Sequence, residues 1–252
     1  MILAVEDLSK KFVGVEALRP LSFAIERGIT AIIGPNGAGK TTLFNLLSGI
    51  DEPTSGRIRH RGEDITALSV AHRARRGIQR TFQNLQIFFR MSAVENVIVG
   101  ASGRLRLGLL SSLLSVPAVR RETSEIEERA AELMRELGLT DFIGRGADSM
   151  PYGALKRLEI ARALAANPEI LMLDEPAAGL NPRETAQIDE LIRNISSRGI
   201  TVLLVEHDMK LVMGVSQRVI VLDHGKRIAD GTPREVQSNP EVVRAYLGAA
   251  AI

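Results

Sequence analysis

The stretch that decides the fold of this chain is Gly34-Pro35-Asn36-Gly37-Ala38-Gly39-Lys40-Thr41-Thr42. It fits the phosphate-binding pattern G-x-x-x-x-G-K-[ST]. The β-branched run Ile29–Ile33 before it predicts a buried parallel strand, and Thr41–Leu47 after it has helical spacing until Gly49. Strand, glycine loop and helix together point backbone N–H groups and a helix N-terminus at phosphate oxygens. The alternative, a chance glycine-rich turn, does not explain this context, and the glycine spacing excludes the dinucleotide pattern G-x-G-x-x-G.

Composition places the chain among ordinary soluble globular proteins. It has 252 residues, of which 45% are hydrophobic and 25% charged. A net charge of +2 gives no strong reason to expect nucleic-acid binding. The absence of cysteine excludes disulfides, thiol catalysis and cysteine-ligated metals. We expect neither a signal peptide at Met1–Asp7 nor a membrane span, because no apolar run approaches about 18 residues.

Periodicity and turn signals predict an α/β frame interrupted by helices. We expect strands at 2–8 and 21–25, joined by a connection over Lys10–Pro20, and an edge strand at 57–60. A solvated helical turn at Ser69–Arg76 and a strand over Ile78–Gln83 are expected next. Two helices follow, one capped by Ser92 and Glu95 and a long one at 118–137. We then expect strands at 170–175 and 200–205 on either side of a helix at Pro182–Ser197. A hairpin at 218–230 and helices from Pro233 and Pro240 complete the prediction. We therefore assign residues 1–83 and 166–252 to a nucleotide-binding core with a β subdomain, and 84–165 to a helical subdomain.

Polar residues follow several of the predicted strands. Ligands in open α/β sheets bind beyond the carboxyl ends of the strands, where Lys40, Gln83, Asp174 with Glu175, and His207 are expected to converge. Asp174 follows four apolar residues, so its burial needs a partner, and a bound Mg²⁺ is expected to supply it. Glu175 would then polarise a water for attack on a γ-phosphate. Helix capping by the acidic pair and a structural role for His207 are the alternatives.

Three residues are candidates for contact with a nucleotide or its metal ion. Lys40 can reach the β- and γ-phosphates, and the Thr41 hydroxyl can bind Mg²⁺. Phe12, shortly before the glycine loop, can stack on an adenine ring, although a core or hairpin aromatic is an equal alternative at this position.

Over essentially its whole length the chain resembles the ATP-binding subunits of ABC transporters, with the motifs in order. The resemblance matches Phe12 to the adenine-stacking aromatic, Gly34–Thr42 to Walker A, Gln83 to the Q-loop, residues 150–154 to the signature, Ile170–Glu175 to Walker B, Ala178–Pro182 to the D-loop and His207 to the switch histidine. It implies an α/β, ABC-type P-loop NTPase core with an antiparallel β subdomain and an inserted helical subdomain. It also implies ATP hydrolysis at a head-to-tail dimer interface, with each ATP between Walker A of one subunit and the signature of the other.

The resemblance implies catalytic, Mg²⁺-binding and ATP-binding roles for the residues at the matching positions. It implies Glu175, His207 and Gln83 as catalytic residues and Thr41, Gln83 and Asp174 as the Mg²⁺ site. It implies an ATP-binding set of Phe12, Asn36, Gly37, Gly39, Lys40, Thr41, Thr42, Tyr152 and Gly153.

Several segments resemble the larger ATPase type of branched-chain amino acid importers. They are Arg80–Gln83, Gly108–Leu114, Arg157–Arg162, Pro176–Pro182, Glu206–Met213 and Arg244–Gly248. Several are shared with urea/amide importers and with the lipopolysaccharide-export ATPase. The resemblance implies permease subunits, a second ATPase subunit or a second copy, an indirect solute-binding partner, no nucleic acid, and a peripheral place on the cytoplasmic face of the inner membrane. Leu105–Pro117, with the Gln83 region, is our candidate permease contact, and internal packing is the alternative.

One motif departs from the family pattern. The signature is close to Leu-Ser-Gly-Gly-Gln in the family and is Met150-Pro151-Tyr152-Gly153-Ala154 here. Pro151 removes a hydroxyl and a backbone N–H from a group expected to hold a γ-phosphate, whereas the Tyr152 and Gly153 N–H groups and a helix beginning near Ala154 remain. We expect weakened closure at that site, and therefore a chain that hydrolyses ATP against a different partner subunit's signature and turns over slowly alone.

Three other interpretations remain open. The chain could be the ATPase subunit of a lipid or lipopolysaccharide exporter, or it could be a soluble ABC ATPase acting on nucleic acid or ribosomes. The single ATPase unit, the lack of cysteine and the small net charge disfavour the soluble class. Glu175 disfavours a purely structural nucleotide-binding module.

Overall fold

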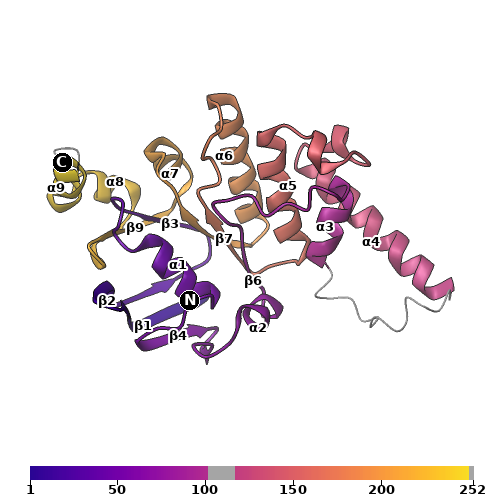
Figure 1. The fold of residues 1–252 in the computed structure, drawn as a ribbon. Helices are drawn as coiled ribbons and strands as arrows, with labels where there is room; N and C mark the ends of the chain where they lie inside the picture. The colour runs from indigo at the N-terminus through magenta and orange to yellow at the C-terminus, as the bar shows by residue number, and fades with distance from the viewer. Residues whose placement is uncertain (102–116, 250–252) are drawn as a thin grey trace.

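The computed structural model describes residues 1–101 and 117–249, and it has α/β architecture with two sheets and a group of helices (Figure 1). One sheet has six strands in the order β10-β9-β3-β8-β7-β6, and the other has four in the order β2-β1-β4-β5. The strands are β1 (Leu3–Phe12), β2 (Val15–Ile25), β3 (Ile29–Ile33), β4 (Ser55–His60), β5 (Glu63–Asp64), β6 (Ile78–Arg80), β7 (Ile170–Asp174), β8 (Thr201–Val205), β9 (Arg218–Asp223) and β10 (Lys226–Gly231). The α-helices are α1 (Lys40–Ser48), α2 (Val70–Arg75), α3 (Ala93–Ala101), α4 (Pro117–Glu136), α5 (Tyr152–Ala165), α6 (Pro182–Ser197), α7 (Met209–Val215), α8 (Pro233–Gln237) and α9 (Pro240–Ala249).

The six-stranded sheet positions the site. Its strands β3, β6, β7, β8 and β9 run parallel, and β10 pairs antiparallel with β9. Every residue of β3, β7 and β8 is buried, which explains why these strands read as continuous apolar runs and not as alternating ones. Their carboxyl ends lie at one edge of the sheet, so the segments that follow them meet there.

The four-stranded sheet corrects two of our expectations. Residues predicted as a connection over Lys10–Pro20 instead extend β1 and β2, which pair antiparallel around a turn at Val13 and Gly14. Gly14 has a φ of 78°, a left-handed conformation that permits so tight a turn. Strand β4 lies between β1 and β5 and is therefore not an edge strand.

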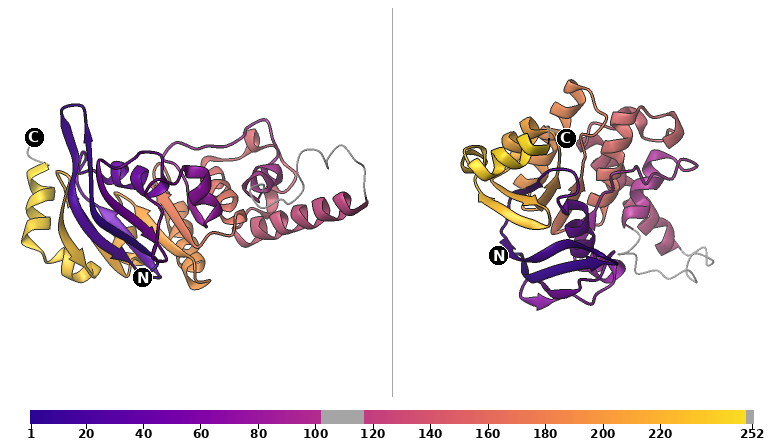
Figure 2. Two further views of the ribbon diagram at one scale, coloured as in Figure 1. Left: turned by 90° about the horizontal axis from the view of Figure 1, so that it is seen from below. Right: turned by 60° about the vertical axis from the view of Figure 1, so that its left-hand side comes forward.

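Helices α3, α4 and α5 pack on one another at one end of the molecule, and α8 and α9 lie at the opposite end (Figures 1 and 2). Ser92 and Glu95 form the predicted reciprocal cap at the start of α3. Helix α6 begins at Pro182 with Asn181 and Glu184 forming a capping box. No described helix is long and apolar enough to cross a membrane. The leucine-rich stretch from Leu105 lies outside the described residues.

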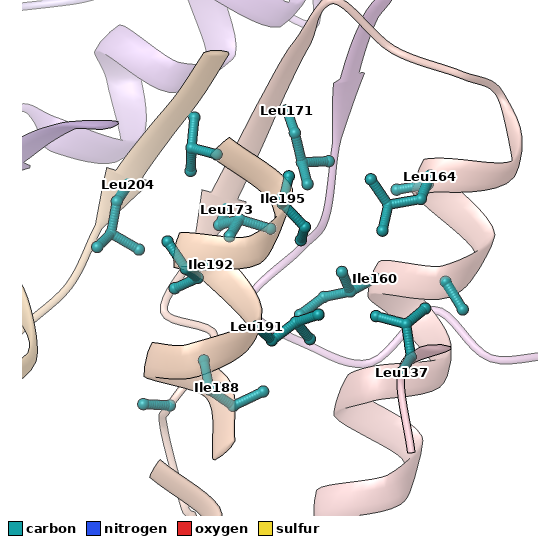
Figure 3. Packing of buried hydrophobic residues seen from close by; sticks show 14 of the residues in the cluster. Leu137, Ile160, Leu164, Leu171, Leu173, Ile188, Leu191, Ile192, Ile195 and Leu204 are labelled. Atoms are coloured by element: carbon teal, nitrogen blue, oxygen red, sulfur yellow. The ribbon is translucent and has the colours of Figure 1, made fainter. Parts of the chain in front are cut away.

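Helix α6 joins the sheet to the helical group. Figure 3 shows that its apolar face lies between sheet residues and α5. The labelled residues of this cluster are Leu137, Ile160, Leu164, Leu171, Leu173, Ile188, Leu191, Ile192, Ile195 and Leu204. A continuous apolar core therefore runs from the sheet through α6 into the helical group.

Two local expectations near α2 need correction. The strand predicted to end at Gln83 ends at Arg80. The helical turn predicted as a solvated face is exposed at most of its positions, but Arg73 is buried at 1% exposure. The Arg73 guanidinium donates hydrogen bonds to backbone carbonyls near the end of α1 and in the segment before α2, and it thereby satisfies oxygens that the helix end leaves free.

The α6 core gives a first prediction. Replacement of the fully buried Ile192 by alanine should lower the free energy of unfolding by about 2–5 kcal/mol, because it removes buried methyl groups and leaves a cavity. Urea denaturation measures this difference. The exposed Gln187 on the same helix is the control, and Gln187→Ala should change stability by no more than about 0.5 kcal/mol. Equal losses in the two variants would contradict this account of the core.

Candidate active site

The glycine loop between β3 and α1 has the backbone that a phosphate cradle requires. Gly34, Gly37 and Gly39 have φ angles of 151°, 78° and 100°. A Cβ on Gly34 would lie 2.0 Å from the Leu222 carbonyl oxygen, so a larger residue does not fit there. The loop ends at Lys40, the first residue of α1. Successive N–H groups and the positive end of the α1 dipole therefore face the same space, which suits a phosphate.

Lys40 is buried over this loop. Its Nζ donates hydrogen bonds to the carbonyl oxygens of Gly34, at 2.7 Å, and Pro35, at 2.9 Å. Desolvation lowers the pKa of Lys40, and the charges of Glu175 and Asp174 oppose that shift. The lysine therefore lies within the electrostatic reach of both carboxylates that follow β7.

Three of the predicted catalytic residues come together beyond β7 and β8. Glu175 Oε1 lies 2.7 Å from His207 Nε2, and Glu175 Oε2 accepts a hydrogen bond from Gln83 Nε2 at 3.0 Å. The Glu175 backbone N–H donates to the Val205 carbonyl, and its φ of 49° is unusual for a residue with a side chain. This left-handed conformation directly follows the end of β7, and such backbone strain is typical of functional positions. A carboxylate held from two sides can accept a proton from a water molecule.

Asp174 has an arginine as its partner in the structure, and not the Mg²⁺ that its burial was expected to require. The structure supplies Arg80, whose Nη2 donates to Asp174 Oδ2 at 2.7 Å, and both side chains are 6% exposed. Burial of this carboxylate is therefore already compensated within the chain, without a metal ion. The argument that burial alone requires Mg²⁺ fails, although the carboxylate keeps its place at the end of the strand.

The residues predicted for Mg²⁺ offer hard oxygen donors. Thr41 is exposed in the first turn of α1, and its hydroxyl makes no hydrogen bond to another described residue. Asp174 contributes a carboxylate, and Gln83 an amide whose nitrogen contacts Glu175. No group of three or more His, Cys, Asp or Glu residues in the described part of the chain could hold a metal by itself. Mg²⁺ is usually bound through one or two carboxylates together with substrate phosphates and water, and this donor set fits that chemistry.

The remaining predicted nucleotide contacts are divided between the glycine loop, β1 and the start of α5. Phe12 ends β1 and is 46% exposed, so it is not a core residue, and Lys10 Nζ lies 4.9 Å from its ring centroid. Asn36 and Gly37 are exposed, and Thr42 is partly buried. No described hydrogen bond joins Tyr152 or Gly153 to the glycine loop.

The signature segment lies against the D-loop of the same chain. Helix α5 begins at Tyr152, two residues before Ala154, with Pro151 as its N-cap residue. The N–H groups of Ala154 and Leu155 already bond to the Pro151 carbonyl, which leaves the Tyr152 and Gly153 N–H groups free in the first turn. The Tyr152 ring lies beside Gly179, where an added Cβ would be 3.2 Å from the ring.

Three residues that support the site were not singled out from the sequence. They are Arg80, Lys156 and Glu206. Lys156 Nζ donates to the carbonyl oxygens of Gln83 and Glu175, each at 3.3 Å. Glu206 is 3% exposed and accepts the N–H groups of Ala177, His207 and Asp208. Of the three, only Glu206 could have been recognised from its sequence neighbours, because it directly follows a buried strand and precedes His207.

Comparison with known proteins identifies the family. A model described as "ABC transporter" matches residues 18–178, and one described as "Branched-chain amino acid ATP-binding cassette transporter" matches residues 226–252. The chain belongs to the ABC transporter family. It is 48% identical over 251 residues to the high-affinity branched-chain amino acid transport ATP-binding protein LivG of Salmonella typhimurium, covering 99% of this chain and 98% of the relative. It is 34% identical over 250 residues to the lipopolysaccharide export system ATP-binding protein LptB of Haemophilus influenzae, covering 98% and 97%.

Solved structures agree with this assignment. An ATP-binding cassette of an ABC transporter, in its ADP conformation, is 33% identical with a TM-score of 0.85, covering 98% of both chains. The fold is therefore the α/β fold of an ABC ATPase, and this chain is an ATPase of the ABC transporter family.

Replacement of Glu175 tests the centre of the site. Glu175→Gln should lower the rate of ATP hydrolysis at least about 100-fold, because the amide cannot accept the proton of the attacking water. The amide keeps the size of the carboxylate, so ATP affinity should stay within about twofold. Steady-state phosphate release and equilibrium ATP binding measure the two quantities. Glu190→Gln, an exposed carboxylate on α6, is the matched control and should leave both unchanged. A Glu175→Gln variant that still hydrolyses ATP would remove Glu175 from the reaction.

Proposed function

We propose that this ABC ATPase is the ATP-hydrolysing motor subunit of an importer for branched-chain or other hydrophobic amino acids. The observation that carries the hydrolytic part is the Glu175 carboxylate, held between His207 and Gln83 beside Lys40. The full-length similarity to LivG and the family match at residues 226–252 support the solute class.

The geometry supports a role for each residue around Glu175. We assign proton acceptance from the attacking water to Glu175, contact with the γ-phosphate to His207, and orientation of the Glu175 carboxylate to Gln83. Thr41, Asp174 and Gln83 would hold Mg²⁺, which would neutralise charge on the phosphates when bound. The ATP contacts would come from Phe12, Asn36, Gly37, Gly39, Lys40, Thr41 and Thr42, with Tyr152 and Gly153 acting on the nucleotide of the partner subunit.

An apolar patch near Gln83 supports a permease partner. Phe88, Phe89 and Met91 are 47%, 48% and 38% exposed in the segment between β6 and α3. These three residues follow Gln83 in the same segment, so a membrane subunit that contacts them would be close to the nucleotide site. We accordingly place the subunit at the cytoplasmic face of the inner membrane, bound to permease subunits and indirectly to a solute-binding protein. Packing of α3 and α4 on α5 supports 84–165 as the helical subdomain beside a core of 1–83 and 166–252.

The Pro151 position supports pairing with a second, different ATPase subunit. Its φ of −66° and ψ of 156° are also accessible to serine, the usual type of N-cap residue, so the proline removes donors without changing the helix start. One charge-assisted hydrogen bond contributes roughly 1.5–3 kcal/mol, so loss of such donors weakens closure and does not abolish it.

An exporter of lipid or lipopolysaccharide is the second candidate, favoured by the similarity to LptB but at lower identity than to LivG. A urea or amide importer would use the same site. A soluble ABC ATPase acting on nucleic acid or ribosomes has little support from the small net charge.

Reconstitution tests the solute and the coupling together. The ATPase is co-purified with its permease and second ATPase subunits, placed in proteoliposomes, and supplied with a solute-binding protein and leucine. We expect slow turnover of the isolated subunit, faster turnover in the assembly with leucine, leucine accumulation, and loss of all three with Glu175→Gln. Stimulation by lipopolysaccharide but not by leucine would favour the exporter instead.

The signature gives a separate prediction for the isolated subunit. Pro151→Ser should raise its turnover about tenfold, because one restored charge-assisted hydrogen bond of roughly 1.5 kcal/mol corresponds to that factor. The readout is phosphate release at saturating ATP. Pro233→Ser, at the first turn of the distant helix α8, is the control and should have no effect. Vigorous turnover of the unaltered homodimer would show that Pro151 does not limit closure.

A further inference from the structure

Arg80 contacts three parts of the ATP site at once. It ends β6, which pairs parallel with β7. Its Nη2 donates to Asp174 Oδ2 at 2.7 Å, and its Nη1 donates to Asn45 Oδ1 at 2.8 Å and to Ser48 Oγ at 3.1 Å on α1. Arg80 thus links the helix after the glycine loop, the strand that carries Asp174 and the strand that leads to Gln83.

Aromatic rings enclose the guanidinium. Its central carbon lies 5.5 Å from the ring centroid of Phe44 on α1 and 5.3 Å from that of Phe82, the residue before Gln83. Arg80 Nε is buried without a hydrogen-bond partner, so the two Nη groups make all of its described polar contacts. The rings restrict where the guanidinium plane can lie, and this favours a fixed direction for the Nη2–Asp174 bond.

The bond uses one oxygen of Asp174 and leaves the other available. Oδ2 accepts from Arg80, whereas Oδ1 makes no hydrogen bond within the described residues. A buried carboxylate without this partner would carry an uncompensated charge, and it could rotate or withdraw from the edge of the sheet. We propose that Arg80 is a positioning residue that fixes Asp174 so that Oδ1 faces the Mg²⁺ of a bound nucleotide. The inference rests on the proposed Mg²⁺ role of Asp174 and is independent of the transported solute.

ATP affinities measured with and without Mg²⁺ distinguish a positioning role of Arg80 from a merely stabilising one. Partners of metal-binding carboxylates typically affect metal affinity or activity by about 10–100-fold when removed. Loss of Arg80 should therefore reduce the gain in ATP affinity that Mg²⁺ provides. Contacts of ATP with the glycine loop and with Phe12 do not pass through Arg80, so ATP affinity without Mg²⁺ should be nearly unchanged.

The chain offers a matched control for a buried arginine. Arg73 is 1% exposed and also holds α1, through hydrogen bonds to the carbonyls of Leu46 and Leu47, but it makes no described contact with Asp174. A change of Arg73 to methionine should lower the melting temperature without changing the Mg²⁺-dependent gain.

The experiment measures ATP binding to the full-length subunit by titration calorimetry, with Mg²⁺ and with EDTA. All variants carry Glu175→Gln so that the ATP stays intact. Arg80→Met should reduce the ratio of the two affinities about tenfold, with the EDTA value within about twofold of the parent. Arg80→Lys keeps a buried cation but cannot bond Asp174, Asn45 and Ser48 together, so it should recover only part of the ratio.

Each other outcome counts against the inference. An unchanged ratio in Arg80→Met, or equal losses with and without Mg²⁺, would make Arg80 merely structural. Full recovery in Arg80→Lys would show that charge, and not direction, is what matters. A parent protein without any Mg²⁺-dependent gain would instead refute the Mg²⁺ role of Asp174, and with it the inference. If Arg80→Met does not fold, Arg80→Lys gives the decision, since a full wild-type ratio in that variant overturns the proposal.

Discussion

The site depends on how charges are compensated at the edge of a fully buried sheet. Strands β7 and β8 are buried along their whole length and mostly apolar, yet Asp174 ends one of them and Glu206 follows the other. Buried carboxylates persist only when charged or hydrogen-bonding partners satisfy them. Arg80 meets this requirement for Asp174, and the N–H groups of Ala177, His207 and Asp208 meet it for Glu206. These bonds fix the segments that carry Glu175 and His207.

The same constraint connects the sheet to the helical group. Lys156 on α5 is 2% exposed and places its ammonium group on the carbonyls of Gln83 and Glu175. Glu159, one helical turn further, accepts weakly from the Phe82 and Gln86 N–H groups, and burial raises its pKa. A shift of α5 relative to the sheet would therefore disturb Glu175 itself and Gln83, which contacts the Glu175 carboxylate. The apolar contact through Ile188, Leu191, Ile192 and Ile195 of α6 resists such a shift (Figure 3).

Local patterns predicted the parts of the fold that depend on local physics. The glycine loop, the buried strands and the cap of α3 each have a signature within a few residues. The convergence of Gln83, Glu175 and His207 follows from the shared edge of parallel strands. Pairing partners distant in sequence were not predictable in this way. The extent of β1 and β2 is set by their pairing with each other, and the burial of Arg73 by α1 carbonyls 26 and 27 residues away. Arg80 read as an ordinary polar residue in a short strand, because its partner lies 94 residues later.

The position of Pro151 in the fold limits which nucleotide site the substitution in the signature can affect. The free N–H groups at the start of α5 make no described hydrogen bond to the glycine loop of the same chain, and Tyr152 instead lies beside Gly179. The segments that carry Asp174, Glu175 and His207 are held by Arg80, Lys156 and Glu206, none of which contacts Pro151 through a described hydrogen bond. The weakening that we propose for the signature would therefore leave the geometry around Glu175 intact. On the proposed head-to-tail arrangement its effect falls on the nucleotide held by the partner, so one chain can combine a complete hydrolytic site with a reduced contribution to the other site.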